Sequence, residues 1–143
     1  MLRIVPDPGV LIAALISKSG APAELLRRWV RGEFQFVVSP LLLKEFIDVT
    51  QRPRFRTYFA TSDAREFAEL LRLGGEEFID SRTDLKAPTD AKDLYLVDLV
   101  VSCAAFAVVT GDAELRNHDA RSFQALTPRE LVELLDRLDA DRL

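Results

Sequence analysis

The chain has 143 residues, of which 48% are hydrophobic and 29% charged, and its formal net charge is −4. This length fits one domain over residues 1–143 that buries roughly 70% of the surface its unfolded form would expose. The acidic balance excludes a protein that coats nucleic acid through bulk charge, so any such contact is expected to be local. The only cysteine, Cys103, excludes an internal disulfide framework or thiolate zinc site and favours a reducing, cytoplasmic location.

The predicted elements follow one another as strands and helices, and no apolar stretch in the first 20 residues is long enough for a membrane anchor. Three helix starts are marked by a capping residue, at Ser39, Thr61 and Thr127, two of them followed by proline. In chain order we predict a strand at 2–5, a turn at 7–9, helices at 10–17 and 21–32, a strand at 34–39, helices at 39–51 and 61–75, a strand at 77–81, an exposed loop at 82–93, a helix at 93–105, strands at 106–110 and 123–126, and a helix at 127–138.

The predicted strands are apolar throughout rather than alternating, as in "FAVVT" at 106–110. Strands of this kind, separated by helices, indicate an α/β three-layer sandwich around a mainly parallel central sheet. In such sheets the ligand site lies at the carboxyl ends of the strands. Asp7 and Asp112 each follow a predicted strand and are expected at that edge.

Four carboxylates are placed where this architecture can bring them together: Asp7, Glu45, Asp93 and Asp112. Hard oxygen ligands of this kind suit Mg²⁺ or Mn²⁺, which bind a few carboxylates and keep waters for substrate phosphate oxygens. Such an ion polarises a phosphoryl group and activates a water, the chemistry of phosphodiester hydrolysis. Each acid also has an ordinary interpretation: a turn residue for Asp7 and Asp112, a helix cap for Asp93, and a solvated helix position for Glu45.

Four strings of this sequence resemble the PIN-domain family over nearly the whole chain and in the expected order. "VVTGDAEL" is similar to the family's "LVTGDxDL", and "VPDPGVLIAALIS" to its opening "VLDTNVLVSALLS". "FQFVVSPLLLKEFIDVTQRPRF" resembles "FELVVSPELLAELxEVLxRPKF", and "LTPRELVELL" resembles the closing segment. PIN domains are typically metal-dependent ribonucleases, and many bacterial members are toxins held inactive by a small antitoxin protein.

The resemblance implies a metal-binding and catalytic quartet of Asp7, Glu45, Asp93 and Asp112 that holds one or two Mg²⁺ or Mn²⁺ ions. It implies accessory roles for Thr110, Glu114, Asp90 and Asp98. The implied substrate is RNA, cleaved by a metal-activated water, and the implied partner is an antitoxin.

The opening motif departs from the family because Pro8-Gly9 replaces its Thr-Asn. This change removes a hydroxyl and an amide side chain beside Asp7, from which we expect weak metal binding and slow cleavage. An alternative function is therefore a catalytically weak or inactive PIN scaffold that binds RNA or a protein partner. A third is a phosphatase-like hydrolase with Asp7 as nucleophile, although Gly9 stands where such enzymes carry a second acid.

Two clusters combine arginine with aromatic residues. Arg27, Arg28 and Arg31 surround Trp29, and Arg52, Arg54 and Arg56 surround Phe55. Such clusters bind phosphates and stack on unpaired bases, but they also occur as solvated surfaces or partner contacts. The outer face of the amphipathic C-terminal helix is a candidate surface for a homodimer.

Overall fold

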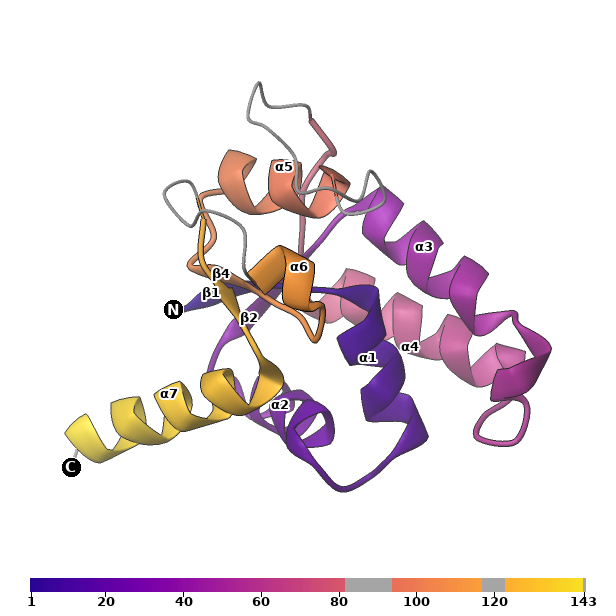
Figure 1. Cartoon of the computed structure of the whole chain (residues 1–143), viewed down its shortest axis with the longest axis horizontal. Coiled ribbons are helices and arrows are strands. Elements are labelled where there is room, and N and C mark those ends of the chain that lie inside the picture. The colour runs from indigo at the N-terminus through magenta and orange to yellow at the C-terminus, as the bar shows by residue number, and fades with distance from the viewer. Residues whose placement is uncertain (82–93, 117–122, 143) are drawn as a thin grey trace.

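The computed structural model describes residues 1–81, 94–116 and 123–142 (Figure 1). Its elements are β1 (Arg3–Pro6), α1 (Pro8–Ile16), α2 (Ala21–Val30), β2 (Gln35–Val38), α3 (Pro40–Thr50), the 3₁₀ turn η1 (Pro53–Phe55), α4 (Thr61–Gly74), β3 (Glu76–Glu77), α5 (Leu94–Ser102), β4 (Ala107–Val109), α6 (Ala113–Arg116), β5 (Ala125–Leu126) and α7 (Pro128–Asp141).

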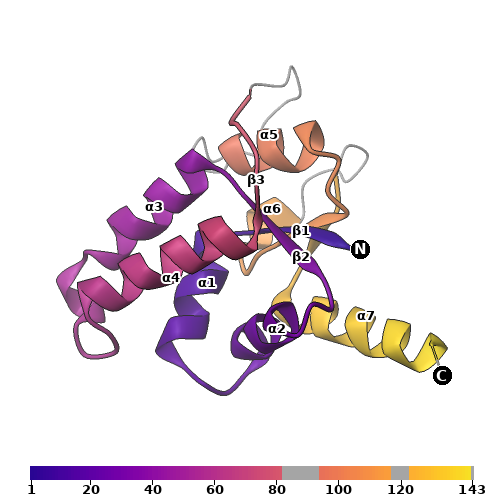
Figure 2. The ribbon, with the colours of Figure 1, turned by 180° about the vertical axis from the view of Figure 1, so that it is seen from behind.

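The strands form a five-stranded sheet in the order β3-β2-β1-β4-β5, and every pairing is parallel. In both Figure 1 and Figure 2, α5 lies on one side of the strands, while α2 and α7 lie on the other. The predicted α/β fold is confirmed. Helices on both faces explain why the central strands β1, β2 and β4 are mostly apolar and buried, whereas the edge strand β3 consists of two exposed glutamates.

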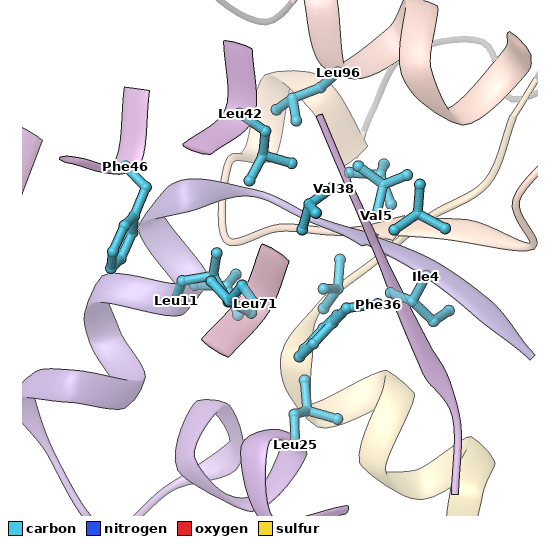
Figure 3. Close-up of a cluster of buried hydrophobic side chains, with 14 of the residues drawn as sticks. Ile4, Val5, Leu11, Leu25, Phe36, Val38, Leu42, Phe46, Leu71 and Leu96 are labelled. Carbon is cyan, nitrogen blue, oxygen red and sulfur yellow. The ribbon is translucent and has the colours of Figure 1, made fainter. Parts of the chain in front are cut away.

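The core forms around the central strands. Ile4 and Val5 of β1 are completely buried, and Phe36 and Val38 of β2 are at most 1% exposed. Figure 3 shows these side chains together with buried residues from the first five helices, among them Leu25 of α2 and Leu96 of α5. Cys103 lies in the same core, as expected, and burial raises the pKa of its thiol. The strand that precedes Asp7 is therefore held on both sides.

The local structure differs from the prediction in several places. Asp7 is the N-cap of α1, which begins at Pro8, so residues 7–9 start a helix rather than form a separate turn. The predicted cap at Thr61 is wrong: Thr61 is the first residue of α4, and Asp63 accepts the Ala60 amide at 2.9 Å. The short elements η1 and α6 were not predicted, because neither has a periodic apolar pattern. The predicted loop at 82–93 lies outside the described residues.

Helix α7 is joined to α2 by apolar packing and by one half-buried arginine. Leu131, Val132 and Leu135 are buried along one face of α7. The guanidinium of Arg28 on α2 donates to Asp136 of α7 and to Glu24 and Glu33, at 3.1 and 3.3 Å for the last two. The hydrogen bonds to Asp136 and Glu24 raise the pKa of Arg28. Arg28 is therefore a structural residue, and the homodimer through the outer face of α7 stays a prediction.

None of the described helices alone has the length and apolar composition of a membrane span. Helices α1 and α2 meet that description only together, and the chain bends by 97° between them.

We predict that Arg28→Ala lowers the free energy of unfolding by about 1–3 kcal/mol, because it leaves neighbouring carboxylates half-buried without their cation. Urea unfolding followed by circular dichroism measures this difference. The control is Arg72→Ala, which removes an exposed arginine paired with Glu69 and should leave the midpoint nearly unchanged. Equal midpoints for the two variants would show that α7 does not depend on the Arg28 contacts.

Candidate functional site

The candidate site lies where the strand order of the sheet reverses. From β1 the chain builds outward through β2 to β3, and it then returns to the other side of β1 with β4 and β5. The carboxyl ends of β1 and β4 therefore lie side by side at a topological switch point, where open parallel sheets bind their ligands. Pro6 of β1 is in register with Val109 of β4, so Asp7 and Thr110 are the first residues beyond each strand.

Both oxygens of the Asp7 carboxylate have hydrogen-bond donors. Oδ1 accepts the backbone amide of Gly9 at 2.9 Å, and Oδ2 accepts the Thr110 hydroxyl at 2.6 Å. The Asp7 amide donates to the Val109 carbonyl at 2.9 Å, which fixes the backbone as well. Asp7 is half-buried and forms no ion pair with an arginine or lysine of the described residues. The orientation of the Asp7 carboxylate is thus fixed, and no cationic side chain of the described residues neutralises its charge.

The turn Asp7-Pro8-Gly9 orients Asp7 through its backbone. The Gly9 amide binds Asp7 Oδ1 although the side chains of the family's Thr and Asn are missing, and the weak metal binding expected from their loss stays a prediction. A Cβ added at Gly9 would meet Asp7 Oδ1 at 3.5 Å, an ordinary van der Waals distance. The site therefore needs the N–H of residue 9 rather than the absence of a side chain there.

Thr110 joins the two strand ends. Its side chain is fully buried, and its hydroxyl donates to Asp7 and accepts the Asp112 amide at 3.0 Å. Its own amide donates to the Leu126 carbonyl of β5 at 2.9 Å. The resemblance implied an accessory role for Thr110, and the contacts suggest how it would act. Its hydroxyl binds both the Asp7 carboxylate and the backbone amide of Asp112.

Asp7 and Asp112 also line the same hollow, which has a volume of about 300 Å³. The remaining lining residues are small or apolar: Gly9, Val10, Ala13, Pro22, Gly111 and Pro128. The two aspartates are therefore the only charged groups in this lining among the described residues. A carboxylate pair in an apolar hollow is suited to a cation rather than to an anion.

The other predicted acids within the described residues are not among those that line this hollow. Glu45 is half-buried on α3, and Asp98 is buried on α5 at 6% exposure. Within residues 1–81, 94–116 and 123–142, no three Asp, Glu, His or Cys side chains form a group that could hold a metal ion. Asp90 and Asp93 lie outside the described residues, and so does the side chain of Glu114. The full quartet thus stays a prediction.

Asp80 is an acid at the same edge that we did not predict. It follows β3, and its Oδ2 accepts the Leu41 amide in the first turn of α3 at 3.0 Å. Its Oδ1 is buried and accepts no hydrogen bond from the described residues. No signal in the sequence indicated this position, because Asp80 lies inside the strand predicted at 77–81, whereas β3 ends at Glu77 and leaves Asp80 beyond the strand. Its contact with α3 identifies it as a helix-capping group.

The described donors fit a hard divalent cation. Mg²⁺ is typically bound through one or two carboxylates and keeps waters that substrate phosphates replace. Asp7 and Asp112 supply two carboxylates, and each carboxylate oxygen of Asp7 keeps acceptor capacity beyond its one hydrogen bond. All of these donors are oxygens, which favours Mg²⁺ or Mn²⁺ over zinc or copper.

Comparison with known proteins identifies the family and agrees with the fold. A sequence profile described as "PIN domain" matches residues 3–114. Among solved structures, VapBC2 from Rickettsia felis, bound to a DNA fragment from their promoter, shares the fold with a TM-score of 0.61 at 11% identity. That match covers 88% of this chain and 98% of the other. A search of curated proteins finds no significant match.

We predict that Thr110→Val weakens Mn²⁺ binding about 10–100-fold, because Asp7 and the Asp112 amide lose a common partner. The same change should lower the free energy of unfolding by about 1–3 kcal/mol, since it leaves polar groups near the buried hydroxyl unsatisfied. Titration calorimetry and urea unfolding measure the two effects. Thr110→Ser keeps the hydroxyl and should resemble the wild type in both. If the valine variant also matches the wild type, Thr110 does not organise the site.

Proposed function

The chain belongs to the PIN-domain family, and from this premise we propose that it is a metal-dependent ribonuclease, the toxin component of a toxin-antitoxin pair. The observation that carries the proposal is the Thr110 hydroxyl at the switch point of the sheet, which binds both the Asp7 carboxylate and the backbone amide of Asp112. The two aspartates line one hollow, and their side chains offer only oxygen atoms as metal ligands. These are the features that phosphodiester hydrolysis assisted by Mg²⁺ or Mn²⁺ requires.

The residues of the chain have separate roles in this proposal. Asp7 and Asp112 hold the cation, with Asp93 and Glu45 as the further ligands that the family resemblance implies. Thr110 and the Gly9 amide orient Asp7 before any ligand arrives, so little reorganisation is needed on binding. When bound, the cation would polarise the phosphoryl group and lower the pKa of the attacking water. Val10, Ala13 and Pro22 form an apolar wall beside the two aspartates.

We predict that Asp112→Asn lowers the rate of RNA cleavage at least about 100-fold, because it removes a ligand charge while keeping the shape. The assay is cleavage of a labelled RNA pool with Mg²⁺ or Mn²⁺, with and without chelator. Asp48→Asn is the matched control, since it removes an equal charge from an exposed residue that pairs with Lys44 on α3.

Two outcomes would contradict the proposed ribonuclease. Cleavage that resists chelator would exclude the metal mechanism. RNA binding without cleavage under any metal condition would favour the alternative, a PIN scaffold that binds RNA without chemistry.

The partner in this proposal is a small antitoxin protein. The support is the fold that this chain shares with the Rickettsia felis structure of VapBC2 bound to a DNA fragment from their promoter. We expect expression of this chain alone to slow the growth of a bacterial host, and Asp112→Asn to abolish that effect. Co-expression of a small protein encoded next to it should restore growth and give a complex by size-exclusion chromatography. Equal growth inhibition by the wild type and Asp112→Asn would contradict a toxin that acts through this site.

A further inference from the structure

The turn between α3 and α4 carries unpaired positive charge in an acidic protein. Residues 49–60 contain three arginines and no aspartate or glutamate, whereas the whole chain has a net charge of −4. In both Figure 1 and Figure 2 this turn lies at the outer end of the α3–α4 helix pair. We call residues 52–58 the arginine turn.

The two arginine clusters of the sequence differ in how their charges are neutralised. In the first cluster, Arg27 pairs with Glu24, Arg28 with several carboxylates and Arg31 with Glu33. In the arginine turn, neither Arg52 nor Arg54 forms an ion pair or a side-chain hydrogen bond with any described residue. The first cluster is thus structural, and the second has free charge.

The arginine turn is held rigid by its own contacts. Phe55 and Phe59 are buried and stacked, with ring centroids 5.7 Å apart and planes inclined by 14°. Arg56 donates to the carbonyls of Thr50 and Phe59 and so closes the turn from within. Arg56 is therefore a structural residue. A charged group on a rigid turn loses less conformational entropy when it binds a ligand.

Two kinds of ligand-binding group remain exposed on this rigid turn. The guanidinium of Arg54 lies over the Phe55 ring at 4.7 Å, which limits its positions but leaves its N–H donors available. Tyr58 is 56% exposed, although a large aromatic side chain is usually better buried. Guanidinium groups bind phosphate through paired N–H donors, and exposed aromatic rings stack on unpaired bases.

We propose that the arginine turn binds single-stranded RNA, with Arg52 and Arg54 on phosphates and Tyr58 stacked on a base. Tyrosine and arginine also occur together at protein interfaces, so the choice of RNA over an acidic protein segment comes from the proposed ribonuclease function. The proposal rests on the proposed ribonuclease function for the identity of its ligand.

The position of the turn relates it to the metal site. Helix α3 begins directly after β2, at the edge of the sheet where Asp7 lies, and its 11 residues extend roughly 16 Å away from that edge. An RNA strand that occupies both places would be held at two points, with the scissile phosphate at the aspartates. The turn would therefore contribute to affinity for long substrates and not to the chemical step.

The test is RNA binding without cleavage. Fluorescence anisotropy with a labelled single-stranded RNA of about 12 nucleotides is measured in chelator, at several salt concentrations. Arg52→Gln/Arg54→Gln should weaken binding about tenfold or more and make the slope of log K against log salt shallower by about 1.4, near 0.7 for each lost phosphate contact. The control Arg72→Gln/Arg137→Gln removes the same charge from exposed residues of α4 and α7 and should bind like the wild type.

A second pair of variants tests the stacking. Tyr58→Ala should weaken binding about tenfold with an unchanged salt slope, and Tyr58→Phe should restore it. The proposal is overturned if the Arg52/Arg54 variant binds like the wild type, or if the control weakens binding equally, which would indicate bulk charge. It is also overturned if an acidic peptide displaces the RNA and Tyr58→Ala has no effect, because the turn would then be a protein-binding surface.

Cleavage of the same RNA with Mn²⁺ separates this proposal from the ribonuclease function. Binding that depends on Arg52 and Arg54 in a protein that never cleaves would contradict the ribonuclease alone. If the protein cleaves RNA in a metal-dependent way but binds it equally well without Arg52 and Arg54, only the proposed function of the arginine turn is contradicted.

Discussion

The parallel pairing of β1 with β4 is the constraint on which the site depends. These strands are distant in sequence, yet their register sets Asp7 level with Thr110. Because the strand order reverses between them, no crossover connection covers their carboxyl ends, and the two strand ends can share a ligand. The buried residues of β1 and β2 hold this register from both faces (Figure 3). A slip of one residue would turn Asp7 away from Thr110, so the core and the site are determined together.

Thr110 fixes the positions of the two aspartates that follow β1 and β4. A buried hydroxyl can donate once and accept, and here it does both, to the Asp7 carboxylate and from the Asp112 amide. Two carboxylates brought together at a sheet edge repel each other unless a cation lies between them, and Asp7 has no cationic partner among the described residues. A divalent ion that binds these aspartates only in the folded domain would add to the stability of the fold.

The fold could be predicted from local sequence, whereas the detailed contacts could not. Apolar strands and capping residues such as Ser39 act within a few positions, so the order of the elements was predicted correctly. The cap at Thr61 was not, because Ala60 can take that place when Asp63 binds its amide. The two arginine clusters look alike in sequence. Only the tertiary structure places Asp136 against Arg28 and gives Arg54 no ion pair with a described residue, since such partners are set by packing and not by spacing in the sequence.

The central claim is that Asp7 and Asp112 bind one divalent cation at the switch point of the sheet. The most direct measurement is a crystal structure of the wild-type chain grown with Mn²⁺, with anomalous differences recorded to locate the metal. We predict an anomalous peak about 2.0–2.6 Å from carboxylate oxygens of both aspartates. A fully ordered site without a peak, or a peak bound only to other residues, would contradict it.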